Sequence, residues 1–316
     1  MFTNLPTKKI GFAVLLSLVL VMAGMLLASS YLHVGPAHDS LRANGIYAGI
    51  IGLSAFVSAF IYGKDFKSFA FKRAKNRYLS QALMVAVLIC WVPYGLNLLA
   101  ETTIISGNIA INPALVVIGL PLTLTFAALQ EMMWRGFLLS NFLKLYGFRK
   151  TSLYIGLISA VCQYPLIIHT RFMYSDTPLW FSLPMFTILM VSLSFVITYF
   201  RILSKSITPG IVIQGLCMYV FHVVIAPTET ARHDGSVFFL HDTGVFYILS
   251  AVVAAVVCNH LFYKSTVHQR IAHKRNKQAL TKEEMPAAES FNLEILSYQT
   301  SALAPNIAAS ESGNAD

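Results

Sequence analysis

The stretch that decides the fold is residues 113–140, PALVVIGLPLTLTFAALQEMMWRGFLLS, whose only charged residues are Glu131 and Arg135. A helix that crosses a bilayer needs ~20 apolar residues, because each residue adds ~1.5 Å along the axis. This run is longer than one crossing requires. We therefore expect a membrane-spanning helix that projects beyond the bilayer.

Other apolar segments of membrane-spanning length accompany it, at 10–32, 45–63, 78–99, 152–170, 179–200, 207–226 and 244–263. Only 12% of the 316 residues are charged, about half the share that is typical of soluble proteins. This composition argues against a cytosolic enzyme, a nucleic-acid reader or a largely disordered chain. The sequence predicts an all-α fold, a polytopic transmembrane helical bundle of about eight spans.

Charge placement predicts the orientation of this bundle. Of the 23 Lys and Arg residues, 19 lie in the segments 1–9, 64–77, 141–151, 201–206 and 264–316, and only three lie in the opposite loops. By the positive-inside rule, both termini then face the cytoplasm. We expect an integral protein of the plasma (inner) membrane, and we do not expect nucleic acid as a partner.

The chain divides into four parts by composition. Residues 1–112 hold the N-terminal transmembrane helices, 113–226 the core, 227–263 an outer loop and the last span, and 264–316 a basic juxtamembrane segment with a tail. Six Lys and Arg residues in 264–282 favour contact with anionic lipid headgroups, so membrane lipids are expected partners. The acidic, Ala- and Ser-rich sequence from Glu283 onward predicts disorder.

Glu131 and Arg135 are the acidic and the basic residue that lie well inside a span. They are four residues apart, so they share one face of the helix and can pair. Ionisable residues within a membrane commonly mark functional sites. The structural alternative is a self-neutralising pair that fixes this helix against its neighbours.

The residues around this pair resemble a known family. Gln130-Glu131-Met132-Met133-Trp134-Arg135 is similar to the first motif of the CAAX-processing and bacteriocin-processing (CPBP) intramembrane endopeptidases, which is Glu-Glu, any three residues, then Arg. The second family motif is Phe, any three residues, then His. Pro165 stands at the Phe position here, and His169 keeps the His.

The third family motif is His, any three residues, then Asn, and a Ser-x-x-Pro sequence commonly precedes it. Ser206 and Pro209 match this lead-in, but Gln214 stands at the His position and Met218 at the Asn position. The resemblance covers residues 113–226 and implies the helical-bundle fold of these proteases.

The resemblance also implies roles for these positions. The first Glu of motif one and the His of motif two act on water, and the two residues of motif three stabilise the oxyanion. Gln130 is neutral and cannot act as a base, Gln214 can still donate through its amide, and Met218 has no donor. The catalytic set is therefore incomplete, with Glu131, Arg135 and His169 as the remaining candidates.

Helix geometry predicts where these residues meet. Glu131 lies 16 residues before Gly147, a predicted helix stop at a cytoplasmic turn, and His169 lies 22 residues after it. These separations correspond to ~24 Å and ~33 Å of helix. After an allowance for the turn, we expect Glu131, His169 and Gln214 to line a pocket that opens to the cytoplasm.

Three functions remain open. The first is a CPBP-like membrane protein that recognises a membrane-embedded or lipidated peptide or protein, with weakened or lost proteolysis. The second is an active intramembrane endopeptidase that uses Glu131 and His169. The third is a small transporter or channel with the Glu131–Arg135 pair along its path. No cofactor is expected, and a divalent metal is a weaker expectation, from His233, Asp234, His241 and Asp242 of the outer loop.

Overall fold

The structure is a computed structural model of the whole chain. It describes residues 7–31, 39–61, 69, 71–105, 113–170, 177–225, 229–239 and 243–280. The predicted disordered tail from Glu283 onward lies outside the described residues.

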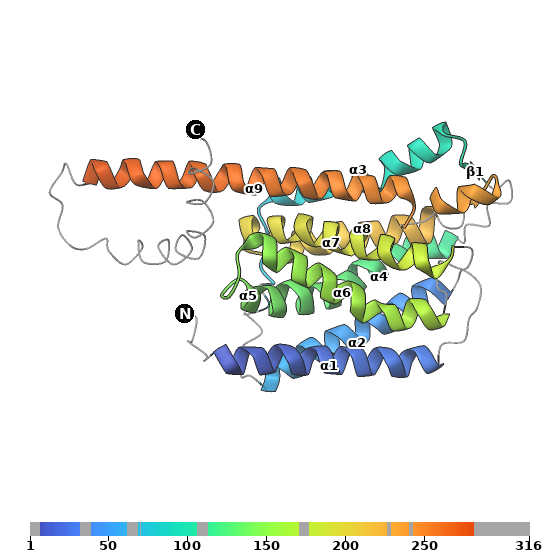
Figure 1. Cartoon of the computed structure of the whole chain (residues 1–316), viewed down its shortest axis with the longest axis horizontal. Helices are drawn as coiled ribbons and strands as arrows, with labels where there is room; N and C mark the ends of the chain where they lie inside the picture. The colour runs from blue at the N-terminus through green and yellow to red at the C-terminus, as the bar shows by residue number, and fades with distance from the viewer. Residues whose placement is uncertain are drawn as a thin grey trace, which may run out of the picture.

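Long helices at the predicted positions make up the molecule (Figure 1). They are α1 (Thr7–Tyr31), α2 (Asp39–Ile61), α3 (Asn76–Leu99), α4 (Pro113–Glu131), α6 (Phe148–Thr170), α7 (Leu179–Ser204), α8 (Thr208–Tyr219) and α9 (Val245–Leu280). The prediction of an all-α membrane helical bundle is confirmed.

Within the described part of the chain, five helical stretches are long and apolar enough to cross a membrane: Asn76–Leu99, Val116–Phe142, Leu179–Ser204, Thr208–Ile225 and Val245–Ser265. Shorter apolar stretches, Leu15–Leu27 and Gly45–Ile61, lie in α1 and α2. Helix α6 occupies the fifth predicted span but is not among these five stretches.

The over-long fourth span is one helical run with a change of winding. Helix α4 passes into the π-helix η2 (Met132–Leu138), and the short helix α5 (Leu139–Phe142) completes the run before the turn to α6. Every residue of η2 is buried. A π-helix inserts an extra residue into a turn, and such segments occur frequently at functional sites. This one begins directly after Glu131.

Two apolar cores lie on either side of the α4–η2 run. One packs α1, α2 and α6 around Met133 and Trp134, and the other joins α3, α7, α8 and α9 around Ile197 and Tyr247. Helix α4 contacts both α2 and α8. The middle of the chain is therefore held on both sides, which fixes the position of Glu131 and Arg135.

A small sheet, which the sequence did not predict, closes the end of the bundle opposite the α5–α6 turn (Figure 1). Strand β1 (Thr103–Ile105) pairs antiparallel with β2 (Glu229–Ala231), with Thr103 opposite Ala231. An ion pair between Arg232 Nη1 and Glu101 Oε2, 2.6 Å long, lies beside it. These contacts join the loop after α3 to the loop before α9.

Candidate functional site

The predicted ion pair is formed and lies inside the bundle. Arg135 Nη1 donates to Glu131 Oε1 over 2.8 Å, and the two side chains are 3% and 0% exposed. The first residue ends α4 and the second lies in η2. Each charge is removed from solvent, so each depends on the other for its stabilisation.

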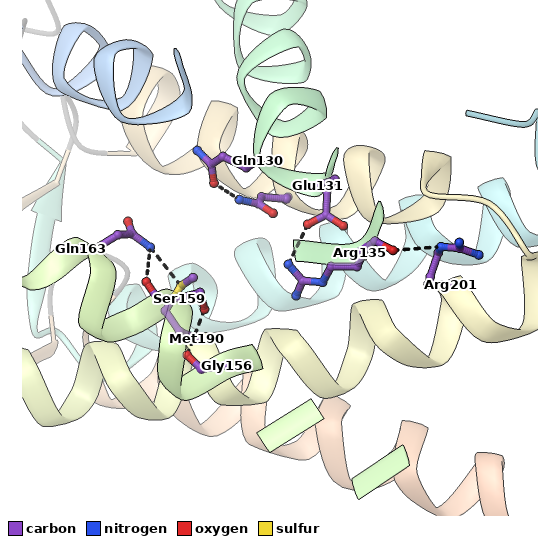
Figure 2. A network of polar contacts seen from close by, with 9 residues as sticks. Gln130, Glu131, Arg135, Gly156, Ser159, Gln163, Met190 and Arg201 are labelled. Carbon is purple, nitrogen blue, oxygen red and sulfur yellow. Dashed lines mark hydrogen bonds and ion pairs between the residues drawn. The ribbon is translucent and has the colours of Figure 1, made fainter. Parts of the chain in front are cut away.

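Two neighbouring helices complete the surroundings of this pair. From α7, Arg201 Nε donates to the backbone carbonyl of Arg135 over 3.4 Å (Figure 2). From α8, Gly210 approaches so closely that a Cβ at this position would lie 2.5 Å from Glu131 Oε2. The absence of a side chain at Gly210 thus leaves room for the carboxylate.

Sequence reasoning missed the contribution of Arg201. It counted this residue among the charges of a cytoplasmic segment, because the predicted span ended at residue 200. In the structure α7 continues to Ser204, so Arg201 belongs to the last turn of the helix and is half-buried. Arg201 follows the predicted span by one position, and this placement could have indicated that it belongs to the end of the helix.

The first and third motifs meet through two glutamines. Gln214 Nε2 of α8 donates to Gln130 Oε1 of α4 (Figure 2). Gln130 is 2% exposed and Gln214 is half-buried. Met218 lies one turn further along α8, where it is 9% exposed. The structure thus brings together Gln130 and Gln214. The family resemblance implies catalytic roles for the positions at which these two residues stand.

The second predicted motif, with Pro165 and His169, lies near the end of α6. The backbone of His169 is in the last turn of α6, which ends at Thr170, and its side chain lies outside the described residues. Its convergence with Glu131 stays a prediction. Figure 2 shows two polar side chains on α6, Ser159 and Gln163, and Gln163 Nε2 donates to the Ser159 carbonyl over 3.3 Å.

The site therefore holds a neutral pair of amides beside a buried, paired carboxylate. Glu131 is the only carboxylate among these site residues, and Arg135 engages one of its oxygens. Among the described residues, no group of three or more His, Cys, Asp or Glu side chains could hold a metal ion. His241 and Asp242 lie outside those residues.

Comparison with known proteins identifies the central part of the chain. Residues 112–220 match the family described as type II CAAX prenyl endopeptidase Rce1-like, about a third of the chain. No curated protein matches. Gln130, Glu131, Arg135, Gln214 and Met218 all lie within the matched residues. The resemblance inferred from the motifs is confirmed: this is an integral membrane helical bundle whose residues 112–220 match the Rce1-like CAAX prenyl endopeptidase family.

Proposed function

We propose that this protein recognises a membrane-embedded or lipidated peptide or protein in a CAAX-protease-like site, and that its proteolysis is weakened or lost. The observation that carries this proposal is the hydrogen bond between Gln130 and Gln214. These residues stand at the positions where the family resemblance implies a general base and an oxyanion donor.

A neutral amide cannot take the proton of an attacking water. Losing a general base lowers a rate on the order of 10²–10⁴-fold. Met218 also provides no hydrogen-bond donor, and losing one oxyanion donor costs about 2.7–4 kcal/mol of transition-state stabilisation. The two effects together support a site that has kept its architecture while losing most of its hydrolytic power.

An active endopeptidase with Glu131 as base is the second candidate. It is favoured by Glu131 Oε2, which has no hydrogen-bond partner among the described residues. Against it, Arg135 holds the other oxygen, and Gly210 lies directly against Oε2, so a water molecule has little space to approach. The geometry favours a structural ion pair over a general base.

The setting proposed for this site follows from the charge pattern. Both termini face the cytoplasm, the membrane is the plasma membrane, and lipid headgroups contact the basic connecting segments. The proposed site has no cofactor. A peptide that carries a lipid or a transmembrane helix would then be anchored in the same membrane as the site.

Reconstitution into liposomes with a farnesylated peptide tests the proposal. A photoreactive amino acid at position 214 is expected to crosslink the peptide, while mass spectrometry detects no cleaved product. The same photoreactive group at the lipid-facing Leu249, which is 53% exposed, is the matched control and should not crosslink. Cleavage that disappears in Glu131→Gln would favour the second candidate. Absence of crosslinking and of cleavage would contradict both.

A further inference from the structure

Gln163 lies at nearly the same depth in the bundle as Gln130. Gln130 is twelve residues from Phe142, the last residue of α5, and Gln163 is fifteen residues from Phe148, the first residue of α6. His169 is twenty-one residues from the same start. At ~1.5 Å per residue these depths are about 18, 22 and 32 Å from the shared turn.

Core packing supports this depth independently. Cys162, the neighbour of Gln163, belongs to the apolar core that contains Met133 and Trp134 of η2. Ile167, two residues before His169, instead belongs to a separate cluster with Phe186 of α7. Among the described residues, the stretch of α6 that packs in the core of η2 therefore ends at Cys162, next to Gln163, and does not extend to His169.

The Gln163 side chain is half-buried and polar at this level. Its Nε2 donates to the Ser159 carbonyl and lies 3.9 Å from Met190 Sδ of α7. Figure 2 shows it toward the end of the network where Gln130 lies, whereas Arg201 lies at the other end. Ser159 and Gln163 are also four residues apart, which is the spacing of the second family motif, Phe, any three residues, then His.

The two paired glutamines leave hydrogen-bonding capacity unused. One bond between two carboxamides engages one N–H and one oxygen, so a carbonyl oxygen remains on one side chain and an amide nitrogen on the other. In the structure Gln214 Oε1 is buried and has no hydrogen-bond partner among the described residues. A buried acceptor in a membrane bundle, away from bulk water, is costly until a donor reaches it.

We propose that Gln130, Gln163 and Gln214 form one binding site for a backbone peptide group of a membrane-embedded polypeptide. A peptide group presents one N–H and one C=O, which is the complement of what an amide pair leaves unused. Gln163 acts here as a binding residue at the position that sequence reasoning gave to His169. This inference rests on the proposed function and names its ligand chemistry.

The test uses a short farnesylated peptide and analogues in which one backbone amide at a time is replaced by an ester. An ester keeps the chain shape but removes the N–H donor. Binding is measured by fluorescence anisotropy to the full-length protein in phosphatidylcholine–phosphatidylglycerol nanodiscs. For the wild type, an ester at one position should lower affinity about tenfold, which corresponds to about 1.4 kcal/mol.

Gln163→Met preserves side-chain length without a hydrogen-bonding group. It is expected to weaken binding of the all-amide peptide about tenfold. The ester analogue that binds the wild type more weakly should then bind this variant as well as the all-amide peptide does. Gln163→Asn, whose amide is too short to reach, should behave in the same way and guards against a folding defect in the first variant. Val161→Met, at a position of the same helix whose side chain is 47% exposed, is the matched control and should keep the wild-type affinity and ester profile.

The outcomes separate this inference from the proposed function. Peptide that fails to bind the wild type contradicts the proposed function itself. Peptide that binds wild type and both Gln163 variants equally overturns the three-amide site and leaves the proposed function standing. Weaker binding to the Gln163 variants with an unchanged ester scan shows a structural role for Gln163 and also overturns the three-amide site. An equal loss of binding in Val161→Met overturns it as well.

Discussion

A carboxylate and a guanidinium that are both buried stabilise a bundle only while both are present. Glu131→Ala and Arg135→Ala each leave one unpaired charge in a low-dielectric site, which costs ~3–5 kcal/mol. We expect each variant to accumulate less in membranes and to unfold at lower temperature in detergent.

The double variant Glu131→Ala/Arg135→Ala should lose less stability than the two single variants together, because neither charge is then left alone. A fluorescence melting curve of each purified protein measures this coupling. Two single variants with wild-type melting temperatures would show that the pair contributes no stability.

Gly210 packs directly against the carboxylate of the Glu131–Arg135 pair. A Cβ there would lie 2.5 Å from Glu131 Oε2 and 2.6 Å from Ile197 Cγ2, so Gly210→Ala must displace the carboxylate or α7. Overpacking of this kind costs typically about 1–3 kcal/mol. We expect a lower melting temperature in detergent for Gly210→Ala.

Gly95→Ala is the control for that experiment. Gly95 lies in α3, and nothing would meet a Cβ there within 4 Å. Removal of a helical glycine should be neutral or stabilise by about 0.5–1 kcal/mol. Equal melting temperatures for the two alanine variants would mean that Gly210 does not press on the ion pair.

At the scale of helices, α6 and α7 pack closely at Gly156. A Cβ at this position would lie 2.5 Å from Val191 Cα, a backbone atom that cannot turn aside. Gly156→Ala should therefore separate the two helices, lengthen the 2.6 Å Tyr164–Thr187 hydrogen bond and cost about 1–3 kcal/mol.

Thermal unfolding and peptide crosslinking at position 214 check this separation of helices. Stability should fall, and crosslinking should fall with it if the displacement of α6 disturbs the site. Gly49→Ala in α2, where a Cβ would have open space, serves as control. Wild-type stability of Gly156→Ala would show that α6 and α7 can shift apart without cost.

Helix positions could be predicted because they depend on local composition. The apolar run 179–200 predicted α7 to within a few residues of Leu179–Ser204, and the four-residue spacing of Glu131 and Arg135 was enough to predict their pairing. Both follow from the rise and repeat of one helix, so no knowledge of neighbouring helices is needed.

Features that depend on more than one helix could not be predicted. No repeating pattern of apolar residues in the sequence indicates the π-helix at Met132–Leu138. None indicates that Thr103–Ile105 pairs with Glu229–Ala231 either. Which α6 residue, Gln163 or His169, lies at the depth of Gln130 depends on where α5 ends and α6 begins. A shift of six residues changes the depth by ~9 Å, which exceeds what the motif spacing alone can resolve.

At the scale of the whole molecule, basic residues gather in the connecting segments at one end of the bundle. One end of the bundle, opposite β1, holds the start of α1, the α5–α6 turn and the extension of α9 (Figure 1). At that end the structure describes exposed basic residues on three connections, Lys72, Arg73, Lys75, Lys144, Arg149, Lys150 and Lys205. The cytoplasm is the compartment that such a charged end favours.

Reporter fusions test this orientation and the number of crossings together. Fusions after Gly63, Gly147, Ser204 and Ser265 should read cytoplasmic, and fusions within 100–112 and 227–243 should read outside. The informative position is Arg171, directly after α6, because α6 is not among the five stretches that are apolar enough to span by composition. An outside reading there means that α6 crosses the membrane, shielded by its contacts with α1 and α7. A cytoplasmic reading at Arg171, or two reversed reporters elsewhere, would contradict the eight-span arrangement.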